Sequence, residues 1–248
     1  DAFRGFFESM EPGGTLLYFE EDAELAALVA ADASPIRKIP YRTPEHRHDG
    51  TQWYWITPMG ELPMSVMGRH NLANAEGARW LAQEMGIQEA DFYEAIASFQ
   101  GAQRRLEPLA DSARRAVYLD FAHAPSKVAA TTAAFSESFG SRPVWGLLEL
   151  HTFSSLNPEF LPGYAGSLNG LDRAMVLFDP AAVAHKKLPP LSPDAVRAAF
   201  GPGVEVFTSS DALRETLERD APEQLNLLIM SSGNLGGWDV RSWAPQFV

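Results

Sequence analysis

The sequence predicts an α/β fold in two parts, an α+β unit over residues 1–108 and a domain with a mostly parallel sheet over residues 109–248. In the second part, hydrophobic runs of strand length alternate with helical patterns, which is typical of βαβ units. In the first part, a hairpin signal is followed by two amphipathic patterns. The chain of 248 residues is 46% hydrophobic, which is enough to supply a sizeable core.

The first part begins with a β-rich run that leads into an acidic turn and an Ala/Leu segment, a pattern that favours a strand followed by a helix. A Pro-Met-Gly-Glu turn then joins two further strands. Strands are expected at 15–19, 51–57 and 62–67, and helices at 20–31, 72–85 and 91–99. Asn71 is the expected cap of the middle helix and Gly86 its expected end.

The second part reads as a Rossmann-like sheet with helices between its strands. Strands are expected at 117–121, 144–150, 174–178, 204–207 and 225–230, and helices at 126–139, 158–168, 193–200 and 211–217. The boundary between the parts falls where charged residues and Pro108 interrupt the hydrophobic pattern.

Charge and composition exclude several classes of function. Twenty basic and thirty-two acidic residues give a net charge of −12, so we expect no nucleic-acid partner. The chain has no cysteine, which excludes disulfides and thiolate metal sites. The apolar stretches are shorter than the roughly 18 residues that span a bilayer, so we expect no membrane insertion and a cytoplasmic location. The first residue is not Met, and we expect a fragment of a longer protein.

Two asparagines, Asn71 and Asn74, lie in the stretch Gly-Arg-His-Asn-Leu-Ala-Asn at 68–74. Their spacing places both amides on one face of a first helical turn. An amide offers a donor and an acceptor side by side, which matches the edge of adenine. Taken alone, the pair is more typical of a helix cap at Asn71 and a solvated side chain at Asn74 than of an adenine site.

The wider pattern resembles the Mur ligases, ATP-dependent enzymes that join amino acids or peptides to a UDP-sugar. In that family a Gly-x-His-Asn-x-x-Asn-Ala stretch precedes a helix, a Leu-Gly-Ile-like turn and a Phe-x-Gly-x-x-Arg-Arg-Phe-Glu-like element. This chain has Met-Gly-Ile at 85–87 and Phe-Gln-Gly-Ala-Gln-Arg-Arg-Leu-Glu at 99–107. The resemblance implies that His70, Asn71 and Asn74 bind the nucleotide of ATP, and that Arg105 lies near its phosphates.

Asp120 and His123 lie at the carboxyl end of the strand expected at 117–121, the edge where parallel sheets bind ligands. By themselves they could equally be a helix cap and a loop histidine. Mur ligases have Asp-x-x-His-x-Pro-like sequences at this step, and the resemblance implies that Asp120 serves the ribose and that both residues are catalytic candidates. Folate-polyglutamylating relatives share the motif, and Ala124 replaces a second histidine of many members.

The Glu-Leu-His-Thr-Phe-Ser-Ser stretch at 149–155 resembles the Pro-His-Thr-x-Ser-Arg element of alanine-adding Mur ligases, with Ser155 in place of the arginine. Free L-alanine is therefore not the favoured acceptor. Residues 178–180, 185–190 and 230–237 look like the peptide-recycling branch, which attaches a murein tripeptide to UDP-N-acetylmuramate. The resemblance implies that the acceptor is bound by a set of polar residues and one glycine, namely His123, His151, Ser155, Ser231, Ser232, Gly233 and Asn234. The structural alternative for the glycine-rich end is a simple exit from a strand.

None of the four lysines follows a glycine, so these 248 residues contain no Gly-x-x-x-x-Gly-Lys-Ser/Thr phosphate loop. The resemblance implies ATP and Mg²⁺ as cofactors, with the phosphate loop, most magnesium ligands and the UDP-sugar domain on the amino-terminal side of this sequence. We expect no metal site within the chain and no activity of the fragment alone. Two alternatives remain: an alanine-adding or folate-type ligase, and a non-catalytic nucleotide-binding or interaction module.

Overall fold

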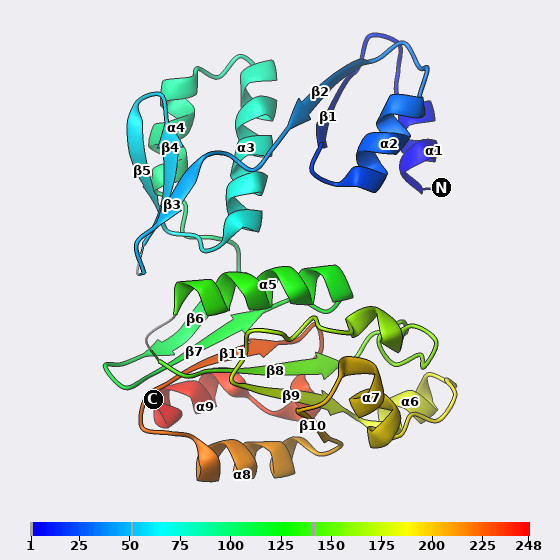
Figure 1. The fold of residues 1–248 in the computed structure, drawn as a ribbon, viewed down its shortest axis with the longest axis vertical. Coiled ribbons are helices and arrows are strands. Elements are labelled where there is room, and N and C mark those ends of the chain that lie inside the picture. The colour runs from blue at the N-terminus through cyan, green and yellow to red at the C-terminus, as the bar shows by residue number, and fades with distance from the viewer. Residues whose placement is uncertain (1, 51, 140–141) are drawn as a thin grey trace. The chain divides into compact units, whose positions relative to one another are not determined.

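The computed structural model describes residues 2–50, 52–139 and 142–248. The chain forms two compact units, residues 1–100 and 101–248 (Figure 1). The units divide before the expected boundary at residue 108, because β6 (Glu107–Asp111) pairs antiparallel with β7 (Arg115–Asp120) in the sheet of the second unit.

The first unit opens with a parallel pair of strands, β1 (Thr15–Phe19) and β2 (Arg37–Tyr41). Two helices accompany it, α1 (Ala2–Glu8) and α2 (Ala23–Ala31). The Asp22 carboxylate accepts a hydrogen bond from the Leu25 amide at 2.9 Å and caps α2. Strand β1 and helix α2 confirm the expected strand and helix, although the helix begins after the acidic turn.

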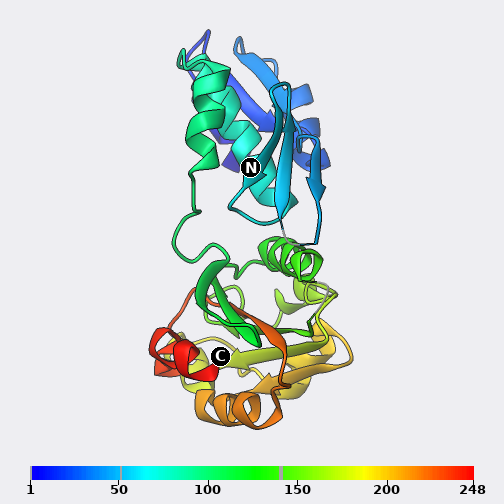
Figure 2. The same ribbon diagram turned by 90° about the vertical axis from the view of Figure 1, so that its left-hand side faces the viewer.

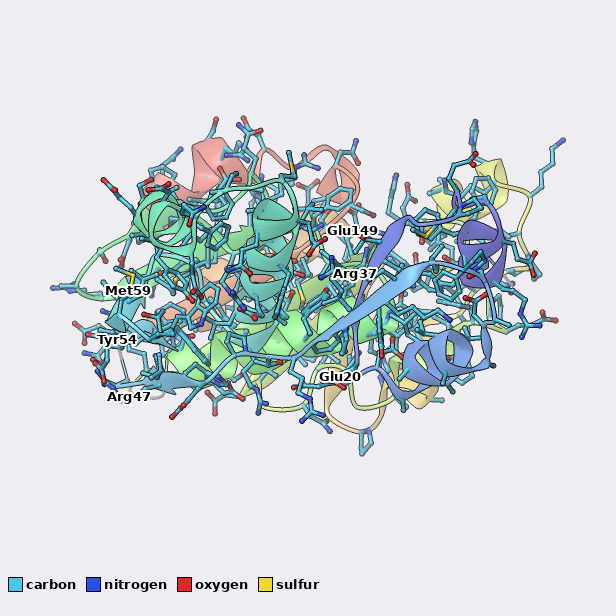
Figure 3. The ribbon with its side chains drawn as sticks, turned by 90° about the horizontal axis from the view of Figure 1, so that it is seen from above. Glu20, Arg37, Arg47, Tyr54, Met59 and Glu149 are labelled. Atoms are coloured by element: carbon cyan, nitrogen blue, oxygen red, sulfur yellow. The ribbon has the colours of Figure 1, made fainter. Side chains whose placement is uncertain are left out.

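The rest of this unit is a three-stranded antiparallel sheet, β3 (His46–His48), β4 (Trp53–Thr57) and β5 (Gly60–Met64), with α3 (Arg69–Glu84) and α4 (Glu89–Ala97). Trp53 and Trp55 are buried with residues of both helices. The expected hairpin is confirmed, although residue 51 of the expected strand lies outside the described residues. On the exposed side, the guanidinium of Arg47 lies 4.2 Å from the centre of the Tyr54 ring (Figure 3).

The second unit is built on a six-stranded sheet in the order β10-β9-β8-β11-β7-β6. Its other strands are β8 (Val144–Leu150), β9 (Arg173–Phe178), β10 (Val204–Phe207) and β11 (Leu225–Met230). Strands β7 to β11 are parallel, which confirms the expected mostly parallel sheet. Helix α5 (Pro125–Ser138) covers one face, and α8 (Ser210–Asp220) and α9 (Val240–Phe247) cover the other (Figures 1 and 2).

Alternate residues of the strands pack on these two faces. Leu119, Leu147 and Ile229 join α8 and α9 in the main hydrophobic cluster. Both faces are thus buried, which explains the near-continuous hydrophobic runs of these strands.

Two sequence expectations are wrong in detail. The helix expected at 158–168 is a series of turns around the 3₁₀ helix η1 (Leu161–Tyr164), because Pro162 and the positive φ of 72° at Gly166 interrupt helical geometry. Asn71 does not cap α3, since the helix starts at Arg69 after Gly68, whose φ is 86°. Helices α6 (Pro180–His185) and α7 (Pro193–Phe200) follow η1 in the chain, and η2 (Leu235–Gly237) precedes α9. In the described part of the chain, no helix has the length and apolar character that crossing a bilayer requires.

Candidate functional site

The carboxyl ends of three neighbouring strands, β7, β11 and β8, bring distant parts of the sequence to one sheet edge. Met230 pairs with Asp120 of β7 on one side and with Leu148 of β8 on the other. The Ser231 amide continues the ladder and donates to the Asp120 carbonyl at 2.9 Å. The residues expected after these strands therefore start from the same edge, where parallel sheets expose backbone groups to ligands.

Asp120 is a buried carboxylate whose hydrogen bonds are made mainly to backbone. One oxygen accepts from the Leu106 amide at 2.9 Å, and the other accepts from the Ala122 amide at 2.7 Å and from the Thr131 hydroxyl at 3.3 Å. The residue is 2% exposed. In the structure Asp120 fixes the segment before β6 and the turn after β7, and its contact with a ribose remains a prediction.

His123 lies in the turn between β7 and α5, next to this carboxylate in sequence. Its Nδ1 is 2.9 Å from the Phe121 carbonyl oxygen. The Tyr164 hydroxyl donates to the His123 carbonyl, and burial raises the pKa of Tyr164 to about 12, so the phenol keeps the proton that it donates. The backbone of His123 is thereby tied to η1.

Glu149, which the sequence expectations did not include among the site residues, is buried near the end of β8 at 5% exposure. It is labelled in Figure 3. One of its oxygens accepts from the Ser231 hydroxyl, and the other lies 3.9 Å from Nδ1 of His151. The signal in the sequence was a single charged residue inside an otherwise apolar strand.

The side chains at these strand ends are divided between the two faces of the sheet. Asp120 points toward α5, since it accepts from Thr131 of that helix. Glu149 and Ser231 lie two positions after Leu147 and Ile229, which pack toward α8 and α9. Side chains two positions apart in a strand share a face, so Glu149 and Ser231 lie on the face of α8 and α9. Asp120 therefore leaves the sheet on the face opposite to Glu149 and Ser231.

Ser155 is fully buried and belongs to a turn of the loop after β8. Its hydroxyl is 2.9 Å from Thr152 Oγ1 and 3.2 Å from the Thr152 carbonyl. This placement gives Ser155 a structural role in the loop, and contact with an acceptor remains a prediction.

The glycine-rich segment 231–237 borders a hollow of about 280 Å³, which Arg104, Asn234 and Arg241 also line. The Gly233 amide donates to Ser231 Oγ at 3.0 Å, while the buried Ser232 Oγ has no hydrogen-bond partner among the described residues. The hydrogen bond from Gly233 to Ser231 stabilises the backbone of the loop that borders the hollow. Arg104 and Arg241 are cationic residues that the sequence expectations missed.

The positive charge of Arg241 is offset by an ion pair with a carboxylate. Its guanidinium donates to both carboxylate oxygens of Glu107, at 2.7 and 2.8 Å. This pairing lowers the pKa of the Glu107 carboxyl and raises that of Arg241.

In the first unit, the expected nucleotide residues lie on the first turns of α3. Asn74 is exposed and lines an apolar hollow of about 320 Å³ with Leu16 and Tyr41. The side-chain Nδ2 of Asn71 donates to the Met67 carbonyl at 2.8 Å, while His70 is half-buried. Asn71 is absent from the lining of the hollow, so the structure does not bring both asparagine side chains to it.

Arg105, in the second unit, is exposed, and its backbone amide donates to the Ala102 carbonyl at 3.1 Å. Within residues 2–50, 52–139 and 142–248, no group of three or more His, Asp or Glu could hold a metal ion.

Comparison with known proteins gives relatives in both sequence and fold. The chain is 31% identical over 231 residues to a UDP-N-acetylmuramate–L-alanine ligase of Arthrobacter sp. (strain FB24), which covers 89% of this chain and 49% of that protein. It is 32% identical over 186 residues to the ligase of the same name from Paenarthrobacter aurescens (strain TC1), covering 71% of this chain and 41% of that protein. The chain thus spans about half the length of the curated relatives it matches. No protein-family model matches it.

Solved structures show the same fold. A UDP-N-acetylmuramate–alanine ligase from Thermotoga maritima aligns with a TM-score of 0.64 at 17% identity, over 88% of this chain and 48% of that one. A murein peptide ligase from Psychrobacter arcticus 273-4 aligns with a TM-score of 0.65 at 18% identity, over 99% of this chain and 54% of that one. Sequence and fold together support membership of the Mur ligase family, and neither singles out one of its ligases.

Proposed function

We propose that this chain is the acceptor-side part of an ATP-dependent ligase that forms an amide bond on UDP-N-acetylmuramate. The observation that carries the proposal is the convergence of Asp120, Glu149, His151 and Ser231 at one edge of a parallel sheet in a chain whose sequence relatives are ligases. In the proposed reaction, ATP converts the muramyl carboxylate to an acyl phosphate. The acceptor amine then attacks the carbonyl carbon, and phosphate leaves. Catalysis of this kind depends on positioning and on neutralising charge.

The proposed nucleotide contacts are polar and cationic side chains. The amide of Asn74 suits the edge of adenine, with His70 and Asn71 in the same helical turns. Exposed Arg105 suits the phosphates, and Asp120 the ribose. A carboxylate accepts about four hydrogen bonds, and Asp120 already accepts three, so one further hydroxyl could be accommodated. Mg²⁺ is proposed as a cofactor of the longer protein, held by residues outside this chain.

For the acceptor we favour the murein tripeptide L-Ala-γ-D-Glu-meso-diaminopimelate. A free amino acid needs one strong anchor for its carboxylate, whereas a tripeptide can be held by hydrogen bonds distributed along its length. Ser155, at the position of the arginine in the alanine-adding element, is a buried hydroxyl engaged with Thr152. Around the same edge, His123, His151, Ser232, Gly233 and Asn234 offer separate polar groups.

L-Alanine is the second candidate acceptor, and one observation favours it. The two sequence relatives described above are both UDP-N-acetylmuramate–L-alanine ligases. In that case the cation that binds the alanine carboxylate would come from a position other than 155.

The test is an assay of the full-length parent protein with UDP-N-acetylmuramate, ATP and either acceptor. We expect a higher kcat/KM with the tripeptide than with L-alanine, and the reverse order would establish the second candidate. Asn234→Ala should lower kcat/KM for the acceptor several-fold, since a lost hydrogen bond costs about 1 kcal/mol, and leave the KM for ATP unchanged. Asn169→Ala, at another exposed asparagine of the same unit, is the matched control. No ligation with any amine acceptor would refute the proposed function.

A further inference from the structure

The Glu149 carboxylate and the His151 ring are neighbours at the end of β8, with side chains that are 6% and 40% exposed. A buried carboxylate is destabilising unless hydrogen bonds and a counter-charge offset its lost hydration. Glu149 has one such hydrogen bond, from the Ser231 hydroxyl, and its second oxygen faces Nδ1 of His151 at 3.9 Å. The Glu149 carboxylate is thus shielded from solvent, whereas the neighbouring ring of His151 is partly exposed to solvent.

The hydrogen bonds behind Glu149 have a fixed direction. The Gly233 amide can only donate, so Ser231 Oγ accepts from it at 3.0 Å. The single hydroxyl proton of Ser231 is then directed to Glu149 Oε2. Oε1 is left as the oxygen that faces the imidazole.

Gly233 packs so closely against this pair that a side chain at this position would displace it. A Cβ at this position would lie 2.6 Å from Glu149 Oε2 and 2.6 Å from Cγ of His151. The backbone φ of Gly233 is not in the left-handed region, so the glycine is favoured here by lack of space and not by backbone conformation. The glycine-rich loop therefore holds the carboxylate and the ring in place.

We propose that Glu149 is a positioning residue that holds His151 in its Nδ1–H tautomer and leaves Nε2 as an acceptor for the amine of the acceptor substrate. This inference rests on the proposed function. A carboxylate oxygen accepts hydrogen bonds and cannot donate, so the ring nitrogen that faces it is the one that carries hydrogen. The opposite nitrogen then has a lone pair, which suits an incoming amine and which a lysine or arginine could not offer.

The geometry needs one small adjustment. The 3.9 Å between Glu149 Oε1 and His151 Nδ1 exceeds hydrogen-bond range, and a ring shift of about 1 Å closes it. Distances between such partners are often long without substrate and shorten when the site fills.

The first test measures the tautomer directly in this chain by ¹H–¹⁵N correlation spectra of the histidine rings, at a pH where the imidazole is neutral. The chain has six histidines, and His151→Gln assigns the relevant signal. We expect the Nδ1–H form to dominate in the wild type. In Glu149→Gln the Ser231 proton selects the amide oxygen, so the NH₂ group faces the ring and the Nε2–H form should increase. Glu159→Gln, an exposed position in the following loop, should leave the spectrum unchanged.

Gly233→Ala provides a second variant that leaves all charges in place. Its Cβ separates the ring from the carboxylate, so it should shift the tautomer in the same direction as Glu149→Gln. A wild type with dominant Nε2–H, or equal tautomer populations in the wild type and both variants, would overturn the inference.

The second test uses the full-length parent. Glu149→Gln should lower kcat/KM for the amine acceptor roughly tenfold and leave the KM for ATP unchanged. If the parent ligates no amine, the proposed function fails while the tautomer result stands. If the tautomer does not depend on Glu149, this inference fails while the ligase activity stands.

Discussion

Replacing Asp120 with asparagine tests whether this carboxylate fixes the chain before β6. The substitution keeps the shape of the side chain and exchanges one oxygen for an NH₂ group. The less costly orientation keeps the oxygen toward Ala122 and Thr131, and it places the NH₂ group against the Leu106 amide. Two donors then face each other in a buried site.

The magnitude follows from the contact that is lost. A hydrogen bond to a charged group contributes about 1.5–3 kcal/mol, so we expect Asp120→Asn to destabilise the Leu106 segment by about 2 kcal/mol. Leu106 is 4% exposed and has a φ of 47°, a conformation that a leucine adopts only when its surroundings hold it. Local opening at Leu106 should therefore increase more than opening elsewhere in the unit.

Amide hydrogen exchange measures this opening directly. A change of about 2 kcal/mol corresponds to roughly 30-fold faster exchange at Leu106, with a smaller change at Ala122. Asp111→Asn, an exposed carboxylate in β6, is the control and should leave both amides unchanged. Unchanged exchange at Leu106 in a folded Asp120→Asn protein would refute the structural role of the carboxylate.

Two further predictions concern packing and pH. Gly146→Ala places a Cβ 2.4 Å from Leu171 Cδ1, and this crowding should lower the free energy of unfolding, measured by urea denaturation, by about 1–3 kcal/mol. Gly5→Ala is the control, because Gly5 has open space around it, and it should not lower the free energy of unfolding. Equal effects of the two substitutions would contradict the packing argument. The guanidinium of Arg241 lowers the pKa of Glu107 below 4.5, so the pair stabilises the fold above that pH and the contribution is lost as pH falls through the lowered pKa. The Tm of Glu107→Gln should therefore be lower than that of the wild type at pH 7, by an amount that corresponds to at most about 1 kcal/mol. This difference should shrink toward acid pH. A difference that does not vary with pH would exclude this ion pair as its cause.

The sequence predicted the parallel sheet well because its strands are buried on both faces and read as apolar runs. It missed β6, whose Glu-Pro-Leu-Ala-Asp sequence lies on the sheet edge and has weak β character. It also missed α9, where Pro245 interrupts the pattern and Asp239 provides the cap through the Arg241 and Ser242 amides. Both elements depend on tertiary contacts that a local pattern does not record.

The alternation of strands and helices predicted that the candidate residues follow the ends of parallel strands. It did not predict the strand order that makes β7, β11 and β8 neighbours. Which face a side chain takes depends on the register of each strand, and this separated Asp120 from Ser231 although their backbones are paired. Burial also decided between roles, since Ser155 lies in the expected loop and yet has its hydroxyl enclosed.

Glu149 shows why an exception to a pattern carries more information about function than agreement with it. The six other residues of β8 are apolar, and an apolar residue at 149 would extend the core without the cost of burying a charge. Its hydrogen bond to Ser231 and the close fit of Gly233 would be unnecessary with such a residue. A stability argument therefore does not account for the carboxylate, whereas its position behind the half-exposed ring of His151 does.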